Sequence, residues 1–543
     1  MKAERDDDCS ARDGSPWWQS AVIYEIALIS FQDSDADGKG DLTGLMSRID
    51  YLKWLGVDAI WLTPIYKSPF RDLGYDISDY RAIDPAFGSL DEFDKLLAAL
   101  HQAGIRLILD LVPNHTADDH EWFVESRSSP SSAKADWYIW ADAAENGGPP
   151  NNWLSRFGGS AWEWCEARRQ YYYHSFLVEQ PDLNWRNPQV RSAIADVMRF
   201  WLDRGVDGFR VDASAVLIKD AHLRDNPANP DAQGKPPPQR QTPVFTDDRP
   251  ETMQCIEFIR SVIDEYPERL LCGEVQGKTD RIGHFYGTER PRLHLPLNFA
   301  LLDAPWNALS LQAAIDAYFN ALPDGAWPVW VIGGHDKPRI ASKIGEAQLR
   351  VLAMLLMTLR GTPFIYMGDE IGRKRVPIPP DQVQDPFERL VPGYGLCRDP
   401  ERAPMRWDDT ANGGFSDGRP WLPLDPAGST NVTAQQNDDS SILMLFRALL
   451  RLRREHACLR EGDYHPLRSQ NDILAFERVY EGHHMLIVLN IADEPRKWPS
   501  QVSGRVLLST HLDRASGALA AASVLLRGNE GVILSRSIPG SFV

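Results

Sequence analysis

The chain has 543 residues, of which 43% are hydrophobic and 25% charged, and its formal net charge is −18. This composition is typical of a water-soluble globular protein, and the length exceeds that of one ordinary domain. The negative charge argues against nucleic acids and anionic membranes as partners, because both would be repelled. The six cysteines lack zinc-site or disulfide spacing, and the start of the chain has no hydrophobic leader. We therefore expect a cytoplasmic protein with a disordered tail over 1–15.

Short apolar runs alternate with helical patterns along most of the chain. The runs predict strands at 21–26, 58–62, 106–112, 205–213, 269–275, 293–299, 329–333 and 363–367. The clearest helical patterns cover 42–55, 90–103, 189–204, 251–265, 348–359 and 440–454. This alternation is typical of parallel βαβ units, and eight of them predict an α/β fold, the (β/α)8 TIM barrel.

Three segments break the alternation. Residues 115–186, rich in Trp, Ser, Gly and Pro, predict an inserted subdomain that follows the third strand and lies over the barrel mouth. Residues 219–249 are too long for an ordinary connection, so they form either a functional lid or a disordered segment. Short alternating runs near the end predict a C-terminal antiparallel β-sandwich. The barrel domain would then span 16–114 and 187–464, and the sandwich 465–543.

Charged side chains gather where the predicted strands end. The fourth strand ends with Arg210 and Asp212, which on their own fit a buried salt bridge equally well. The carboxyl ends of barrel strands meet on one face, so the other strand-end residues should join this pair. These are Asp110, His115, Glu274, His335 and Asp336.

This set of residues suits one reaction in particular. Arg210 would keep Asp212 ionised, and the charge of Asp336 would help Glu274 to hold a proton. An ionised aspartate facing a protonated glutamate is what retaining glycoside hydrolysis requires. No redox or phosphate-binding motif is present, so we expect no cofactor for catalysis.

An acidic loop follows the first strand. Its carboxylates alternate along the chain, and Gly38 stands at the sixth position, as in the calcium loop of an EF-hand. The bidentate glutamate of that motif is missing, because Gly44 occupies position twelve. The loop therefore predicts a single structural divalent cation, Ca²⁺ or Mg²⁺, with a solvated acidic turn as the alternative. The alternating carboxylates are Asp33, Asp35, Asp37 and Asp41.

The strand-end blocks resemble those of glycoside hydrolase family 13, the α-amylase superfamily. In chain order they are 110–115, 180–185, 208–212, 273–275 and 335–336. The resemblance implies that Asp212 is the nucleophile, Glu274 the acid/base and Asp336 the stabiliser of the transition state. It further implies that the sugar in the −1 subsite is contacted by Tyr75, His115, Arg210 and His335.

Residues 180–185 and 398–405 resemble the α-glucosidase and oligo-1,6-glucosidase group of that family. In that group an aspartate and an arginine bind the terminal glucose, and the resemblance assigns Asp76 and Arg402, with Arg398 the less favoured arginine. It also implies a single metal site formed by the side chains of Asp33, Asp35, Asp37 and Asp41 and the carbonyl of Lys39. Ala213 stands where valine accompanies α-1,6 preference, which favours α-1,4 linkages. The lid resembles that of bacterial α-glucosidases that favour short substrates and transfer glucose to small alcohols.

Aromatic residues of the inserted subdomain, Phe157 and Phe176 among them, offer faces for sugar rings, although most should form local core. The sequence thus predicts an exo-acting retaining α-glucosidase of short α-glucosides, with transglucosylation as an additional activity. The alternatives are a glucosyl isomerase such as trehalose synthase, an α-1,6-preferring glucosidase and, most remotely, an inactive scaffold. Whether the protein is a monomer or a homo-oligomer stays open.

Overall fold

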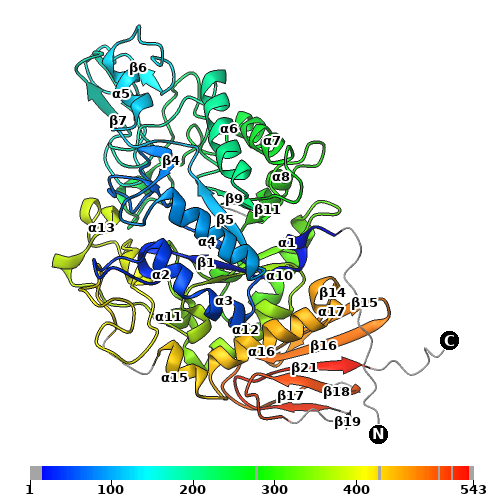
Figure 1. Cartoon of the computed structure of the whole chain (residues 1–543). Coiled ribbons are helices and arrows are strands. Elements are labelled where there is room, and N and C mark those ends of the chain that lie inside the picture. The colour runs from blue at the N-terminus through cyan, green and yellow to red at the C-terminus, as the bar shows by residue number, and fades with distance from the viewer. Residues whose placement is uncertain are drawn as a thin grey trace.

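The computed structural model describes residues 15–275, 279–425, 430–498, 502–514, 518–521 and 523–536. Except for Ser15, the predicted disordered tail lies outside these residues. Eight parallel strands form one sheet in the order β11-β10-β9-β5-β2-β1-β13-β12. The ends of the sheet approach each other where the Asn298 side chain donates a hydrogen bond to the Val329 carbonyl over 3.0 Å. The nearly closed sheet confirms the predicted barrel (Figure 1).

Each predicted barrel strand is present, although most are shorter than the apolar runs. Alternate residues on each strand face inward or outward, as the β pleat requires. Ile23 packs inside the barrel, whereas the neighbouring Tyr24 packs against the outer helices. The strands are β1 Ile23–Ile26, β2 Ala59–Leu62, β5 Arg106–Leu111, β9 Gly208–Val211, β10 Leu270–Glu274, β11 Leu295–Leu297, β12 Val329–Val331 and β13 Thr362–Tyr366.

Helices surround the barrel, and most of the predicted ones are present. The single helix predicted over 42–55 is wrong, because the chain breaks at Arg48 into α2 and α3. The Nε atom of Arg48 donates a hydrogen bond to the side-chain oxygen of Gln32 (2.8 Å), and the guanidinium carbon lies 4.1 Å from the centroid of the Trp407 ring. The longer helices are α4 Leu90–Gln102, α6 Pro188–Asp203, α7 Pro250–Ile263, α10 Ala308–Ala321, α12 Glu346–Thr358 and α16 Ile442–Glu455. The shorter ones are α1 Trp17–Ser20, α2 Leu42–Ser47, α3 Ile49–Leu55, α8 Ile282–Tyr286, α9 Ala300–Asp303, α11 Ile340–Ile344, α13 Pro386–Leu390, α14 Asp399–Arg402, α15 Val432–Gln436 and α17 Ala457–Arg460.

The segment between β5 and β9 projects from one end of the molecule (Figure 1). It holds helix α5 (Glu121–Ser128) and a small antiparallel sheet of β6 (Trp140–Ala141), β8 (Gln170–Tyr173) and β7 (Trp162–Cys165). Trp153, Trp162 and Tyr173 form a compact cluster there, so these aromatic residues are local core, as expected. The hairpin β3 (Tyr66–Lys67) and β4 (Asp79–Ile83) lies between β2 and α4 along the chain.

The long segment 219–249 folds against this inserted part of the chain. The backbone amide of Asn226 donates a hydrogen bond to the Asn152 side chain (2.9 Å), and the Asn152 amide group donates to the Asn226 carbonyl (2.9 Å). The indole of Trp153 donates to the carbonyl of Arg224 (2.8 Å). These bonds fix the segment in place with little regular structure of its own, apart from one 3-10 turn, Pro237–Arg240.

The C-terminal part consists of antiparallel sheets, as predicted. Six strands pair in the order β14-β15-β16-β21-β18-β19, and a separate pair, β17 and β20, covers one face. Ile473 and Val488 pack toward that pair, whereas Phe476 and Ile487 belong to the core shared with the barrel helices. The strands are β14 Asp463–Gln470, β15 Ile473–Tyr480, β16 His483–Asn490, β17 Arg496–Trp498, β18 Val502–Ser509, β19 Ala518–Ala521, β20 Val524–Leu526 and β21 Gly531–Arg536.

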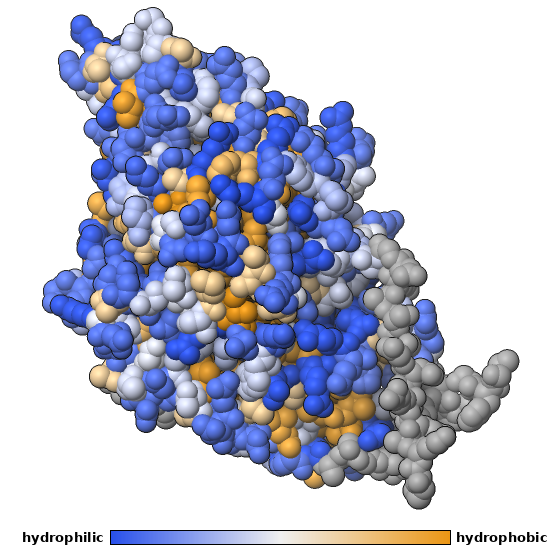
Figure 2. All heavy atoms as spheres, viewed as in Figure 1, coloured by the Kyte–Doolittle hydropathy of each residue, from blue (hydrophilic) through white to orange (hydrophobic). Residues whose placement is uncertain are grey.

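The described helices include none with both the length and the apolar character needed to cross a bilayer. Figure 2 shows a mostly hydrophilic face on which apolar side chains occur in small groups.

Candidate active site

Strand register brings the predicted catalytic carboxylates together. Asp110 on β5 and Cys272 on β10 are both paired with Arg210 on β9, so the three residues stand side by side. Asp212 and Glu274 each follow two residues later and therefore face the same way. The Nη1 atom of Arg210 donates to Asp110 (2.8 Å) and Asp212 (2.7 Å), and its Nη2 atom donates to Glu274 (2.5 Å).

The backbone on both sides of this cluster is tightly constrained. A side chain at Gly208, where β9 begins, would collide with the carbonyl of Leu270, 2.3 Å from the position of its Cβ atom. Glycine therefore allows β9 and β10 to approach closely enough to align Arg210 with its partners. Just beyond Asp212, Ala213 has a φ of 49°, in the left-handed region that non-glycine residues seldom adopt. Such strain is typical of active sites, where the surrounding structure maintains it.

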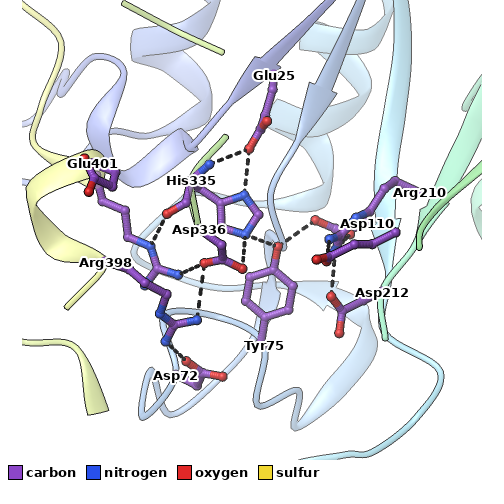
Figure 3. Close-up of polar contacts among 12 residues, drawn as sticks. Glu25, Asp72, Tyr75, Asp110, Arg210, Asp212, His335, Asp336, Arg398 and Glu401 are labelled. Atoms are coloured by element: carbon purple, nitrogen blue, oxygen red, sulfur yellow. Dashed lines mark hydrogen bonds and ion pairs between the residues drawn. The ribbon is translucent and has the colours of Figure 1, made fainter. Parts of the chain in front are cut away.

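A second network of hydrogen bonds and ion pairs centres on His335 (Figure 3). Glu25 accepts hydrogen bonds from the backbone amide (3.0 Å) and the Nδ1 atom (2.6 Å) of His335. The Nε2 atom of the same ring lies 2.9 Å from the Tyr75 hydroxyl and 3.2 Å from Asp336. The Tyr75 hydroxyl in turn donates a hydrogen bond to Asp110 (3.0 Å), so the contacts around His335 are connected to the Arg210 cluster. Sequence reasoning missed Glu25, although a lone acid in an apolar strand signals a buried partner.

A cavity of about 590 Å³ opens onto these groups. Asp212, Glu274 and Asp336 line it, which brings all three predicted catalytic residues to one space. The predicted substrate-binding residues Tyr75, His115, Phe157, Phe176, Ala213 and Arg398 also line the cavity. Arg210 and His335 are buried behind the lining, where they contact the predicted catalytic carboxylates.

The prediction that Asp76 contacts the substrate is wrong. Its side chain is fully buried and accepts hydrogen bonds from the Ser68 hydroxyl (3.0 Å) and the amides of Arg71 (2.8 Å) and Asp72 (3.1 Å). Asp76 therefore shapes the loop, while Asp72 lines the cavity and pairs with Arg398 (2.9 Å). Burial raises the pKa of Asp76 to about 6.

The preference for Arg402 over Arg398 is also wrong. Arg402 does not line the cavity; it donates to the carbonyl of His335 (3.0 Å) and to the carboxylate of Asp336. Arg398 lines the cavity and contacts both Asp72 (2.9 Å) and Asp336 (3.2 Å). Arg402 thus positions Asp336 from behind, whereas Arg398 is available to a bound molecule.

Burial and charge divide the carboxyl groups into two kinds. Burial raises the pKa of Asp212 to about 7, and Arg210 offsets this only in part. Burial also tends to raise the pKa of Asp336, but His335, Arg398 and Arg402 outweigh it and hold that pKa well below its usual range. Burial opposes protonation of His335, yet Asp336 and Glu25 together raise its pKa to about 9. At neutral pH the cavity thus combines an ionised Asp336 with an Asp212 whose pKa of about 7 lies near the pH.

The acidic loop brings together three of the four predicted carboxylates. One carboxylate oxygen from each of Asp33, Asp35 and Asp37 lies within 4.8 Å of the other two. Asp41 does not join this group; its oxygens accept hydrogen bonds from the amides of Ser34 and Gly44 (2.7 Å each), the latter at the start of α2. Three oxygen donors on a short loop suit a hard divalent cation, with carbonyls and water to complete its coordination.

Comparisons with known proteins agree with this geometry. A family model described as alpha amylase, catalytic domain, matches residues 26–462. A probable alpha-glucosidase of Rhizobium meliloti (strain 1021) is 40% identical over 524 residues, which cover 92% of this chain and 94% of the relative. An oligo-1,6-glucosidase of Halalkalibacterium halodurans is 38% identical over 512 residues, 87% of this chain and 90% of the relative.

Solved structures show the same similarity. An alpha-glucosyl transfer enzyme, XgtA, has a TM-score of 0.91 and 39% identity, covering 96% of this chain and all of that one. The trehalulose synthase MutB of Pseudomonas mesoacidophila MX-45 has a TM-score of 0.88 and 33% identity with the same coverage. The likeness therefore extends over nearly the whole chain.

Proposed function

Since the chain belongs to the α-amylase family of glycoside hydrolases, we propose that it is an exo-acting, retaining α-glucosidase of short α-glucosides. Asp212 attacks the anomeric carbon while Glu274 gives its proton to the departing oxygen, so the glycosidic bond breaks as a glucosyl ester forms. Water then returns a proton to Glu274 and releases glucose. This is the two-step course by which one carboxylate and one carboxylic acid retain anomeric configuration.

The observation that carries this proposal is the single guanidinium shared by Asp212 and Glu274. Two carboxyl groups bound to the two terminal nitrogens of one arginine are held close together. Retaining enzymes use carboxyl groups about 5–5.5 Å apart, whereas inverting enzymes leave room for a water molecule between them. The short bridge through Arg210 supports the retaining course.

Action at chain ends is supported by the Asp72–Arg398 pair. A carboxylate and a guanidinium that line the cavity offer acceptors and donors for the hydroxyls of a terminal sugar. Phe387 and Phe157 pack against each other there, with ring centroids 4.3 Å apart, and Arg398 lies over both rings. A wall of this kind favours a closed pocket over an open cleft. The linkage preference rests on a different residue: Ala213, which stands where valine accompanies α-1,6 preference, favours α-1,4 linkages.

Proton NMR of the first glucose formed from an aryl α-glucoside tests the proposal, because all of that glucose comes from the glucosyl-enzyme, whereas half of the glucose from maltose is the leaving group. The retaining course releases α-glucose first, and two glucose molecules accumulate per maltose. Initial release of β-glucose would contradict it.

The similarity to trehalulose synthase favours a second candidate, a glucosyl isomerase, in which the lid keeps water out. Conversion of maltose mainly to another disaccharide, without matching glucose release, would identify that activity.

We expect Asp72→Asn to lower kcat/KM for maltose by about 100-fold, because a buried polar contact to the terminal sugar is lost. Asp76→Asn is the matched control in the same loop. It removes a carboxylate that receives backbone amides, so it should lower the melting temperature and leave kcat/KM much less changed. Steady-state kinetics and thermal melts of both variants would separate these effects. The reverse ranking in kcat/KM would favour Asp76 as the binding residue.

We expect kcat/KM to fall as pH drops through about 7. Asp212 must be ionised to attack, and its raised pKa places protonation there. Asp336 keeps its charge at that pH because its pKa is well below the usual range, and His335 stays protonated with a pKa of about 9. A pH–rate profile with an aryl α-glucoside measures this acidic limb. Activity that persists undiminished toward pH 4 would contradict the assignment.

We propose that the acidic loop binds one structural divalent cation, Ca²⁺ or Mg²⁺, through Asp33, Asp35 and Asp37. The carbonyl of Lys39 remains a predicted ligand, and Asp41 serves as the cap of α2 instead. A cation bound only by the folded state raises the melting temperature by mass action.

EDTA should therefore lower the melting temperature by several degrees, and added Ca²⁺ should restore it. Asp37→Ala serves as the control, because it should remove most of this EDTA response. A melting temperature unaffected by EDTA and by added Ca²⁺ would support the solvated acidic turn.

A further inference from the structure

Two lysines line the same cavity as the catalytic groups. Lys337 directly follows Asp336, and its ammonium lies 4.0 Å from the centroid of the Phe299 ring. Lys235 comes from the lid, far away in the sequence. The two therefore place positive charge on separate walls of one space.

Neither ammonium has a carboxylate within ion-pair distance among the residues that the structure describes. The arginines that line the cavity differ in this respect. Arg156 pairs with Asp247 (2.7 Å), and Arg398 pairs with Asp72 (2.9 Å) and Asp385 (2.8 Å). The charges of both arginines are thus already balanced by carboxylates of the cavity wall, whereas those of Lys235 and Lys337 are not.

Position relates these lysines to the group that leaves during the reaction. Asp72 and Arg398 occupy the part of the cavity assigned to the terminal glucose. Lid residues, among them Asn229, Lys235 and Gln239, contribute much of the remaining lining. A molecule whose glucose rests on Asp72 would extend its other end toward the lid. Lys235 therefore belongs to the wall that the leaving group faces.

Charge explains why lysines are needed there. The cavity is also lined by the carboxyl side chains of Asp72, Asp212, Asp247, Asp248, Glu274 and Asp336. A neutral aglycone needs no counterbalance to these groups, but an anionic one would be repelled by them. Unpaired ammonium groups in a partly enclosed space offset that repulsion and give a charge-assisted contact.

We propose that the leaving-group side of the cavity accepts a short aglycone bearing a carboxylate or a phosphate. This inference rests on the proposed α-glucosidase function and names its substrate class. The molecule is small and singly substituted, so it differs from the polyanions that the net charge of −18 disfavours. Lys337 contacts the anionic group beside the reacting bond, and Lys235 contacts it from the lid.

Matched substrate pairs test this inference. Maltobionate carries a carboxylate on the aglycone of maltose, and trehalose 6-phosphate carries a phosphate on that of trehalose. For at least one pair, the anionic member should have the higher kcat/KM, by about tenfold or more. The pair that shows the preference distinguishes carboxylate from phosphate. Added salt should weaken the preference, because screening reduces charge attraction.

Lysine variants assign the effect to the cavity. Lys337→Met and Lys235→Met should each reduce the ratio of kcat/KM for the anionic over the neutral substrate several-fold. Lys53→Met, an exposed residue on α3, should leave that ratio unchanged. Equal or lower activity on both anionic substrates, or a preference that survives both cavity variants, would overturn the inference. Failure to hydrolyse any α-glucoside, neutral or anionic, would instead overturn the proposed function itself.

Discussion

Asp212→Asn should lower kcat for maltose by about 10⁴-fold or more. Asparagine keeps the shape of the side chain and the contact with Arg210, but its amide oxygen cannot form the glucosyl ester. The loss falls on the step in which the covalent bond is made, so kcat should decline while the cavity remains intact. Steady-state kinetics with a sensitive glucose assay measures the decline. Residual activity within tenfold of the unmodified enzyme would rule out Asp212 as the nucleophile.

The other end of the same strand provides a matched control. Asp207 immediately precedes β9 and pairs with His101 (2.7 Å) and Arg106 (3.3 Å) at the opposite face of the barrel. In barrels of this kind, groups at that face serve stability, while catalytic groups lie at the carboxyl ends of the strands. Asp207→Asn should therefore lower the melting temperature and leave kcat nearly unchanged. Equal loss of kcat in both variants would point to general disruption of the barrel.

Periodicity was sufficient to predict the barrel and the grouping of charged side chains at its strand ends. A run of apolar residues ending in a charge identifies a strand and its active end together, and eight such runs leave few other folds. Register then follows from ordinary parallel pairing, which sets Asp110 beside Arg210 and places Asp212 and Glu274 further along on the same face. The blocks that resemble the α-amylase family pointed to the same residues.

Loops behaved differently, because no periodicity governs them. Asp72 and Asp76 are four residues apart, and only the folded loop shows that Asp72 lines the cavity while Asp76 receives backbone amides. The wrong choice of Arg402 over Arg398 as the substrate-binding arginine has the same origin. Their four-residue spacing across α14 does not reveal which guanidinium reaches Asp72.

The lid shows a further limit. Its composition indicated a long irregular segment, consistent with either a lid or disorder. Its reciprocal hydrogen bonds with Asn152 join residues that are 74 positions apart, which no local pattern predicts. Lys235 of the lid and Lys337 near a strand end line one cavity only in the folded chain. The sequence alone therefore does not show that their charges act on the same bound molecule.

Glu274→Gln should separate the roles of the two carboxyl groups. Glutamine keeps the geometry beside Arg210 but has no proton to give to the departing oxygen. Maltose, whose leaving group needs protonation, should lose about 10³-fold or more in kcat/KM, within the usual contribution of general acid catalysis. A nitrophenyl α-glucoside leaves readily without a proton, so its kcat/KM should fall far less.

The comparison of substrates is the decisive part, since loss of the nucleophile affects both equally. In Asp212→Asn the maltose and nitrophenyl substrates should therefore lose activity together, whereas in Glu274→Gln they should diverge by about tenfold or more. Parallel losses in Glu274→Gln, or divergence in Asp212→Asn, would reverse the assignment of acid and nucleophile. Both side chains contact the same guanidinium, so disturbance of Arg210 alone would not produce the divergence.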